Sequence, residues 1–473
     1  MARTLWLGRY TRSRHQLSFE FGVDDLRFTA SYWYGDVDFY ALEEQYGHDF
    51  STRVYVHIAA FTANTLVSLR PDRFDPGPYA RFCTPEFWAL WKEIVRGIWA
   101  QWRYEHDRPH YLGPELDPAS YHVEGEIALD SAPIQVQPGP VEVLNFCGGG
   151  KDSLVTLKLL ARAGVRFDTL VYSSSIYGPA ARQHKLCDAL LDAACMASDT
   201  RRRIWCYDDL TDSPVLDLFP EYEARSLTAA ETPTSVFLAL PLVLQHGYTH
   251  LCLGHERSAD TGNLVWERTG EEINHQWGKS HEAERLLNGY IRSHLVENCR
   301  YFSILKPIYD VLIFNLLGQD LDAVVYTHSC NQHKPWCGRC PKCAYVWLNY
   351  MAYLPATLVE SIFREHGNLL DTPENQLSFR QMLGLEAHTP FECIGQIDEV
   401  RLAFELCRRK GIKGEAMEVF EREVSPVDVR ATLERYLQIN EALAQDSLPH
   451  GMRDSVLAQM RAAATQARET LLD

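Results

Sequence analysis

Two groups of residues in this chain have the types and spacing that chemistry requires. The first is the glycine-rich stretch Gly148-Gly149-Gly150-Lys151-Asp152-Ser153, and the second is a set of four cysteines far downstream. Glycines let the backbone turn sharply and expose N–H groups to phosphate, whereas clustered thiolates bind a soft metal ion. Together they predict a nucleotide-handling protein that carries a metal-stabilised loop.

The glycine-rich stretch follows an apolar run, Val141–Cys147, and precedes a helical pattern, Lys151–Ala163. At such a junction the loop N–H groups and the positive end of the helix dipole both attract phosphate. We expect Lys151 and Ser153 to contact phosphate oxygens, and Asp152 to hold Mg²⁺ or to orient the ribose or the leaving group. The spacing fits neither a Walker loop nor a dinucleotide fingerprint. The alternative is a tight turn whose glycines serve packing only.

The four cysteines are Cys330, Cys337, Cys340 and Cys343, and the last three have the spacing C-x-x-C-x-x-C. Four thiolates within reach of one ion suit a closed, tetrahedral, structural Zn²⁺ site, which leaves no position open for catalysis. Buried free thiols, or an iron–sulfur cluster on three of the four, are the alternatives.

From Val141 onward, short apolar runs alternate with longer helical patterns, which predicts an α/β fold with a parallel sheet covered by helices on both faces. Ligands bind at the carboxyl ends of the strands in such sheets. The glycine-rich stretch and Gly254–Asp260 should therefore line one crevice. The expected strands are Val141–Cys147, Thr169–Ser173, Arg203–Tyr207 and His250–Gly254, and the expected helices are Lys151–Ala163, Pro179–Ala197, Thr234–His246 and His281–Leu295.

The chain should divide into four parts, and the first and the last of them carry no chemistry that the sequence reveals. Residues 1–135 are expected to form an α+β domain, residues 136–328 the ATP-binding domain, residues 329–395 a zinc-clip segment and residues 396–473 a helical segment. The first domain should contain a hairpin of Leu17–Phe21 and Leu26–Ala30, and helices at Arg53–Leu69 and Pro85–Tyr104 with Thr84 as a cap. The last should contain helices at Met417–Glu423, Val427–Ala444 and Arg453–Leu471, which present solvated faces or a homodimer contact.

The composition of the chain indicates which kinds of binding partner are expected. The 473 residues include 46 Lys and Arg against 63 Asp and Glu, a net charge of -17, which opposes binding to nucleic acid and favours a small-molecule partner. No apolar run of about 18 residues predicts a membrane span, and the first residues lack the apolar stretch of a signal peptide. We therefore expect a cytoplasmic protein whose 13 cysteines are reduced thiols or metal ligands.

The glycine-rich stretch resembles the PP-loop of ATP pyrophosphatases, usually written Ser-Gly-Gly-x-Asp-Ser, with Gly148 in place of the serine. Members of that superfamily cleave ATP between the α and β phosphates and adenylate an oxygen of the substrate. Together with the cysteines, the loop also resembles 7-cyano-7-deazaguanine synthase, which activates a carboxylate with ATP.

A closer resemblance runs from about Val141 to Gly395. The chain is similar there to the MurL-type epimerases, which act on the terminal glutamate of UDP-N-acetylmuramoyl-L-alanyl-L-glutamate in peptidoglycan precursor synthesis. The Gly-Gly-Gly-Lys-Asp-Ser form of the loop belongs to that resemblance. The other stretches that carry it are Gly254–Asp260, Asn274–Lys279, Ser329–Asn331, Trp336–Cys343 and Pro390–Gly395.

This resemblance implies an epimerisation that is driven by ATP and needs no pyridoxal phosphate. A free carboxylate makes the neighbouring Cα–H a very poor acid, because deprotonation would create a dianion. Adenylation removes that charge, so that a base can take the proton and form an enolate. Reprotonation on the other face inverts the centre, and water releases AMP.

The residues that move the proton are not fixed by the sequence. We place His275 ahead of His255, because imidazoles have the right intrinsic pKa for acid–base work. Glu256, Glu272 and Cys393 are rivals, while Arg257 and Lys279 suit pairing with a carboxylate or phosphate. Other functions stay open: ATP-dependent amide or nitrile formation, epimerisation of another peptide in natural-product synthesis, and nucleotide sensing without catalysis.

Overall fold

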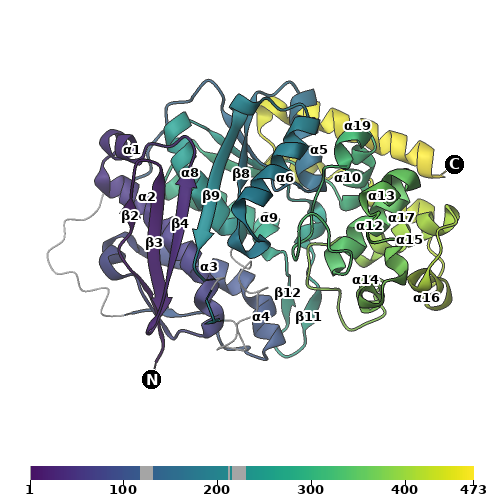
Figure 1. Cartoon of the computed structure of the whole chain (residues 1–473), viewed down its shortest axis with the longest axis horizontal. Coiled ribbons are helices and arrows are strands. Elements are labelled where there is room, and N and C mark those ends of the chain that lie inside the picture. Colours follow the sequence, from purple (N-terminus) through teal and green to yellow (C-terminus); the bar gives the residue numbers. More distant parts are fainter. Residues whose placement is uncertain (1, 118–131, 211–212, 216–230, 473) are drawn as a thin grey trace.

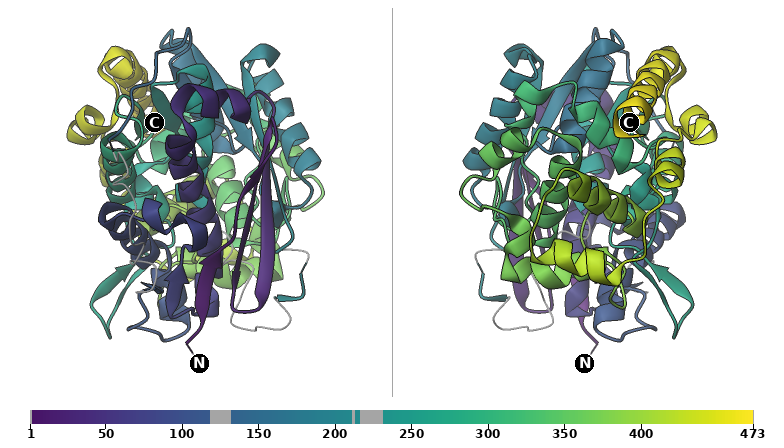
Figure 2. Two further views of the ribbon diagram at one scale, coloured as in Figure 1. Left: turned by 90° about the vertical axis from the view of Figure 1, so that its left-hand side faces the viewer. Right: turned by 90° about the vertical axis from the view of Figure 1, so that its right-hand side faces the viewer.

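The computed structural model of the chain describes residues 2–117, 132–210, 213–215 and 231–472 (Figure 1). A long mixed sheet runs through the molecule in the order β13-β10-β7-β8-β9-β4-β3-β1-β5-β6, with β2 paired to β3. Helices cover both faces of the sheet (Figure 2). Further helices, α12 to α17, gather at the end of the molecule away from the N-terminal strands (Figure 1). The expected α/β architecture is confirmed at this level.

Parallel strands form the part of the sheet that carries the glycine-rich stretch. They are β7 (Val143–Phe146), β8 (Phe167–Tyr172), β9 (Arg201–Asp208), β10 (His250–Leu253) and β13 (Arg300–Ser303). The first four lie close to the strands predicted from the sequence, whereas β13 was not predicted. The chain adds β8 and β9 on one side of β7 and then β10 and β13 on the other. Sheets with such a reversal open a ligand crevice at the carboxyl ends of the strands on either side of it. Here those strands are β7 and β10.

The N-terminal strands continue this sheet. They are β1 (Thr4–Leu7), β2 (Thr11–Arg12), β3 (Gln16–Val23), β4 (Leu26–Tyr34), β5 (Arg73–Asp75) and β6 (Glu115–Leu116). The predicted hairpin is β3–β4, with longer strands than expected and only Asp24 and Asp25 in the turn. Because β4 pairs antiparallel with β9, the N-terminal strands and the parallel strands share one sheet. The domain boundary near residue 135 follows a stretch outside the described ranges and stays a prediction.

Residues of β7 alternate between two cores, as a strand buried on both faces requires. Val143 packs with α5 (Lys151–Arg162) and α6 (Ala180–Ala193), whereas Leu144 packs with the helices of the other face. The helices of that other face are α1 (Phe39–Tyr46), α2 (His48–Ala63), α3 (Pro85–Ile98), α4 (Ala100–Glu105), α8 (Glu231–His246) and α9 (His281–His294). Thr84 caps α3 as predicted, its hydroxyl accepting from Phe87 N at 3.2 Å.

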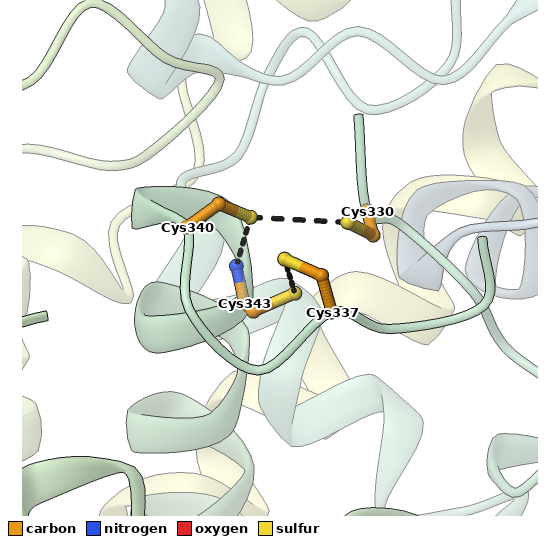
Figure 3. A group of neighbouring side chains, drawn as sticks. All are labelled: Cys330, Cys337, Cys340 and Cys343. Carbon is orange, nitrogen blue, oxygen red and sulfur yellow. Dashed lines mark hydrogen bonds between the residues drawn. The ribbon is translucent and has the colours of Figure 1, made fainter. Parts of the chain in front are cut away.

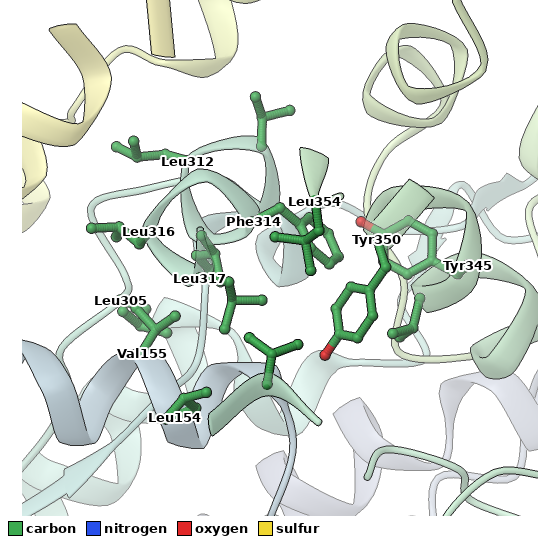
Figure 4. Close-up of a cluster of buried hydrophobic side chains, with 14 of the residues drawn as sticks. Leu154, Val155, Leu305, Leu312, Phe314, Leu316, Leu317, Tyr345, Tyr350 and Leu354 are labelled. Carbon is green, nitrogen blue, oxygen red and sulfur yellow. The ribbon is translucent and has the colours of Figure 1, made fainter. Parts of the chain in front are cut away.

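The C-terminal third is helical and packs behind α5. Leu154 of α5, Phe314 of α10 and Tyr350 of α12 belong to one buried apolar cluster (Figure 4). The helices are α10 (Asp310–Leu317), α11 (Leu321–Val324), α12 (Pro341–Tyr353), α13 (Ala356–Ile362), α14 (Gln376–Met382), α15 (Ile397–Arg409), α16 (Glu415–Glu423), α17 (Val429–Tyr436), α18 (Glu441–Ser447) and α19 (His450–Leu472).

The single helix predicted at Val427–Ala444 is wrong. Helix α17 ends at Tyr436, and α18 begins after Asn440, whose side chain accepts a hydrogen bond from Leu443 N at 3.0 Å. An asparagine at this position competes with the helical backbone and starts a new helix instead. Of the helices within the described ranges, none combines the length and the apolar character needed to cross a membrane.

Candidate active site

The glycine-rich stretch turns the chain from β7 into α5. Gly149 has φ +87°, and a Cβ there would lie 2.1 Å from the imidazole of His328, so this position admits only glycine. Gly150 is the N-cap residue of α5, and within the described part of the chain no side chain caps this helix. The first N–H groups of α5 are therefore available to an anionic ligand.

A cavity of about 230 Å³ lies at the carboxyl ends of β7, β8 and β10. Its lining contains Gly148, Gly150, Asp152 and Ser153 from the glycine-rich stretch. It also contains Gly254, His255 and Glu256 from the loop after β10. The sequence-based expectation that these loops share one crevice is confirmed. The site roles given to their residues stay predictions.

The cavity wall holds charges of both signs. Asp152 and Glu256 line it together with Lys279, Lys334 and Lys342. Burial raises the pKa of Asp152 to about 6 although Lys151 opposes the shift. Burial also favours the protonated form of Glu256, but the surrounding lysines outweigh it and lower its pKa to about 2. Glu256 is thus an ionised carboxylate and a weak base.

Lys151 occupies a different position from the one expected of a phosphate ligand. Its side chain is 1% exposed, and Nζ lies 2.6 Å from Asp152 Oδ1 and 2.6 Å from Asp310 Oδ1. This ammonium joins α5 to α10 beneath the loop. Two of the cationic side chains that line the cavity, Lys334 and Lys342, lie among the cysteines, where the sequence predicted no ligand contact.

The residues predicted to transfer the proton occupy different positions relative to the cavity. His255 and Cys393 line the cavity, whereas His275 lies outside the lining residues that the structure describes. Burial, with Lys279 and Lys306 nearby, lowers the pKa of His255 well below its usual value. The Lys279 Nζ lies 2.9 Å from Cys393 Sγ. Burial tends to raise the pKa of Cys393, but Lys279 and His275 lower it to about 7.

The side chains of two further candidates, Arg257 and Glu272, contact other residues instead of lining the cavity. The Arg257 guanidinium stacks on the ring of Tyr309 at 4.4 Å, and Glu272 accepts a hydrogen bond from Gly262 N at 2.6 Å. Among the described residues that line the cavity, neither side chain is present. Arg257 and Glu272 lie close to His255 and His275 in the sequence, but this did not reveal which side chains face the cavity. In a turn, neighbouring side chains point in different directions.

The four cysteines form a compact cluster (Figure 3). Sγ of Cys330 lies 3.8 Å from Sγ of Cys340, and Sγ of Cys337 lies 3.8 Å from Sγ of Cys343. Metal–sulfur bonds of about 2.3 Å in a tetrahedron place the sulfurs about 3.8 Å apart, so the donor set fits one tetrahedral ion. His333 N also donates to Cys330 Sγ at 3.2 Å, as a thiolate acceptor requires.

The cysteine loop also builds part of the cavity wall. Ser329 and Asn331 flank Cys330, and Lys342 lies between Cys340 and Cys343; all three side chains line the cavity. His328 N donates to Gly149 O at 2.8 Å and so fixes the cysteine loop to the glycine-rich stretch. The cysteine cluster and the glycine-rich stretch therefore lie beside the same cavity.

Two segments that line the cavity match models of known protein domains. The model of the MurL N-terminal domain matches residues 232–304, which include the loop after β10 and Lys279. The model of the MurL C-terminal domain matches residues 325–433, which include the cysteine cluster and Cys393. No solved structure matches the chain.

Three curated relatives carry the name UDP-N-acetyl-alpha-D-muramoyl-L-alanyl-L-glutamate epimerase. The protein of a Micromonospora species is 32% identical over 319 residues, 65% of this chain and 64% of the relative. That of Salinispora tropica is 31% identical over 322 residues, covering 65% and 63%, and that of Xanthomonas oryzae pv. oryzae is 30% identical over 297 residues, covering 60% and 61%. The chain thus matches less than two thirds of the length of each. The models of both MurL domains match the chain in order and these relatives align with much of it, so the chain is similar to the MurL family over these segments.

Proposed function

We propose that this protein is an ATP-dependent epimerase that inverts Cα of the terminal glutamate of UDP-N-acetylmuramoyl-L-alanyl-L-glutamate. The observation that carries the proposal is the cavity in which the uncapped N-terminus of α5 meets residues of both MurL segments. The names of the relatives support the substrate. A mixture of anionic and cationic wall residues suits a ligand that carries phosphates and carboxylates.

ATP would serve as the co-substrate that adenylates the terminal carboxylate and so removes its negative charge. The N–H groups at the start of α5 and the ammonium groups of Lys334 and Lys342 are suited to hold the phosphates. Asp152 offers the carboxylate oxygens that Mg²⁺ prefers. With the charge removed, a base in the cavity wall can take the Cα proton, and a proton returned to the other face inverts the centre.

We further propose that the cysteine cluster holds a structural Zn²⁺. The cluster supplies four thiolates, and all four sulfurs lie within 4.8 Å of one another, close enough to share a single ion. In an iron–sulfur cluster the thiolates bind different iron atoms, which requires more room between the sulfurs. A closed four-thiolate site has no open coordination position, so its contribution is to fix the cysteine loop against the cavity.

The test is incubation of the full-length, metal-replete protein with substrate and ATP in deuterated water. We expect AMP, pyrophosphate and a D-glutamate residue that carries deuterium at Cα. A panel of peptides that end in L-Glu, with and without the UDP-sugar, identifies the acceptor. Turnover without ATP, or an inverted product without deuterium, would contradict the proposal. Product that forms only when ammonia is added would instead establish the amide or nitrile synthase.

A further inference from the structure

Cys393 lies where charged and polar side chains from distant segments meet at the cavity wall. Lys279 Nζ is 2.9 Å from its Sγ. The ligand atoms of His275, Glu392 and Cys393 all lie within 4.8 Å of one another. Among the described residues of this group, Cys393 and Lys279 line the cavity, whereas His275 and Glu392 are not lining residues. The thiol is thus the acid–base group of this cluster that a substrate can reach.

A hydrogen bond to Gln101, in the N-terminal part of the chain, fixes which ring nitrogen of neutral His275 carries the proton. Gln101 Nε2 donates to Glu105 Oε2 at 3.1 Å, which directs Gln101 Oε1 to His275 Nδ1 at 2.6 Å. An amide oxygen accepts only, so neutral His275 carries its proton on Nδ1 and leaves Nε2 as an acceptor. The imidazole lies within 4.8 Å of the Cys393 thiol and is one of the groups that lower the pKa of Cys393. Gln101, His275 and Cys393 therefore form a chain of orienting residue, base and thiol.

We propose that Cys393 is the base that removes the Cα proton in this epimerisation, that Lys279 holds its thiolate, that His275 accepts its proton through Nε2, and that Gln101 positions His275. The inference rests on the proposed function and deepens it. The other wall residues are less suited to the task. Glu256 is too weakly basic, and His255 resists protonation because of its burial and its neighbouring lysines. The pKa of Cys393, about 7, matches neutral conditions, where a general base is most effective.

The step balances without any oxidant or reductant. The Cα–H bond breaks, an S–H bond forms on Cys393, and the electron pair moves to the carbonyl of the activated carboxylate. A proton from solvent or a wall residue then bonds to Cα on the opposite face. Cys393 returns its proton through His275 Nε2 to solvent and is again a thiolate. The Lys279 ammonium keeps its charge throughout, since Cys393 and Glu256 raise its pKa although burial opposes this.

The same side chains could be mistaken for a metal site, because histidine, carboxylate and thiol are all metal ligands. The Lys279 ammonium lies where it would repel a cation that Cys393 held. Metal analysis separates the two interpretations. We expect one ion per chain in the wild type, lost from a cysteine-cluster variant and kept by Cys393→Ala. A second ion that Cys393→Ala removes would overturn the base role.

The decisive experiment compares the two half-reactions in Cys393→Ala. With substrate and ATP in deuterated water, we expect AMP to form while deuterium at Cα and D-glutamate both fall by at least about 100-fold, the range of a lost general base. Deuterium uptake at the wild-type rate would overturn this inference and leave the proposed function standing. Loss of AMP formation in a folded variant, or a substrate thioester on Cys393 in the mass spectrum, would also overturn it. Absence of AMP formation in the wild type would instead contradict the proposed function.

A second measurement needs no substrate and no catalysis. Alkylation of Cys393 by iodoacetamide, followed peptide by peptide across pH, should have a midpoint near pH 7 in the wild type. Lys279→Met should move the midpoint upward, while Lys185→Met, on the exposed side of α6, should leave it unchanged. Gln101→Leu should slow Cα exchange and shift the acidic limb of its pH profile, and Gln101→Glu, which restores an acceptor, should recover the exchange. An unchanged midpoint in Lys279→Met would overturn the assignment.

Discussion

Asn331 Nδ2 donates to Glu392 Oε1 at 2.7 Å, and the same oxygen accepts from Cys393 N at 2.8 Å. One carboxylate oxygen therefore joins the residue after Cys330 to the residue that we propose as base. Lys342, between two of the clustered cysteines, also donates from Nζ to Cys393 O. The cysteine loop thus supports the wall that carries Cys393, so an ion bound by the four cysteines would also stabilise that wall.

Removing one thiolate from the cluster should test this support. Cys340 is buried, and we expect Cys340→Ser to lose the bound ion, to lower Tm by several degrees and to slow Cα exchange. Metal analysis, thermal unfolding and the deuterium assay measure the three effects. Cys195→Ser is the matched control, because Cys195 is exposed on a turn. A Cys340→Ser protein with wild-type Tm and exchange would show that the cluster contributes nothing to the site.

The sequence predicted four of the five parallel strands, because these short apolar runs alternate with helical patterns, but it missed β13. It also placed the glycine-rich stretch and the loop after β10 together, since the carboxyl ends of parallel strands lie at one edge. It did not reveal that Lys151 turns inward, because its partner Asp310 lies 159 residues further along the chain. Gln101 was missed for the same reason: it meets His275 across 174 residues.

Lys151 should be more important for folding than for binding. Lys151→Met would leave Asp310, 2% exposed, without its cation, and breaking such a buried pair costs about 3–5 kcal/mol. Urea unfolding should show this loss, and Lys151→Met/Asp310→Asn should recover part of it. Lys158→Met is the control, since Lys158 lies on the same helix but its partner Asp320 retains Arg162. An unfolding free energy like that of the wild type, with weakened ATP binding alone, would mean that Lys151 contacts phosphate.

The glycines of the loop should respond differently to substitution. Gly149→Ala would force a Cβ against His328 and a positive φ on alanine, a strain of about 1–3 kcal/mol, and should weaken binding of an ATP analogue. Gly148→Ser is the control, because a Cβ at Gly148 meets nothing within 4 Å. Calorimetric titration of both variants measures the difference. Equal affinities would show that the loop can relax around His328.

Lys334 should act through electrostatic attraction to the nucleotide. It lines the cavity with its Nζ 5.0 Å from the Tyr177 ring centroid, and burial lowers its pKa, so an anionic ligand would stabilise its charged form. Loss of a charge-assisted contact costs about 1.5–3 kcal/mol, so Lys334→Met should weaken pyrophosphate binding roughly 10- to 100-fold. Lys185→Met, an exposed lysine of α6, should change nothing. Pyrophosphate affinity that survives Lys334→Met would place the anion on the α5 side alone.

Glu284 of α9 should make the stability of the protein depend on pH. The side chain is 4% exposed, and burial raises its pKa to about 7 although Ser303 and Lys306 oppose the shift and Asp260 adds to it. The unfolded chain releases this proton near pH 4.3, so the free energy of unfolding should fall as pH rises from about 4 to 7, by on the order of 3 kcal/mol. Glu284→Gln keeps the neutral form and should stabilise the protein at pH 8 but scarcely at pH 4.5. Urea unfolding at both pH values measures this, with exposed Glu360→Gln as the control. Equal stabilisation at the two pH values would show that Glu284 stays ionised in the folded protein.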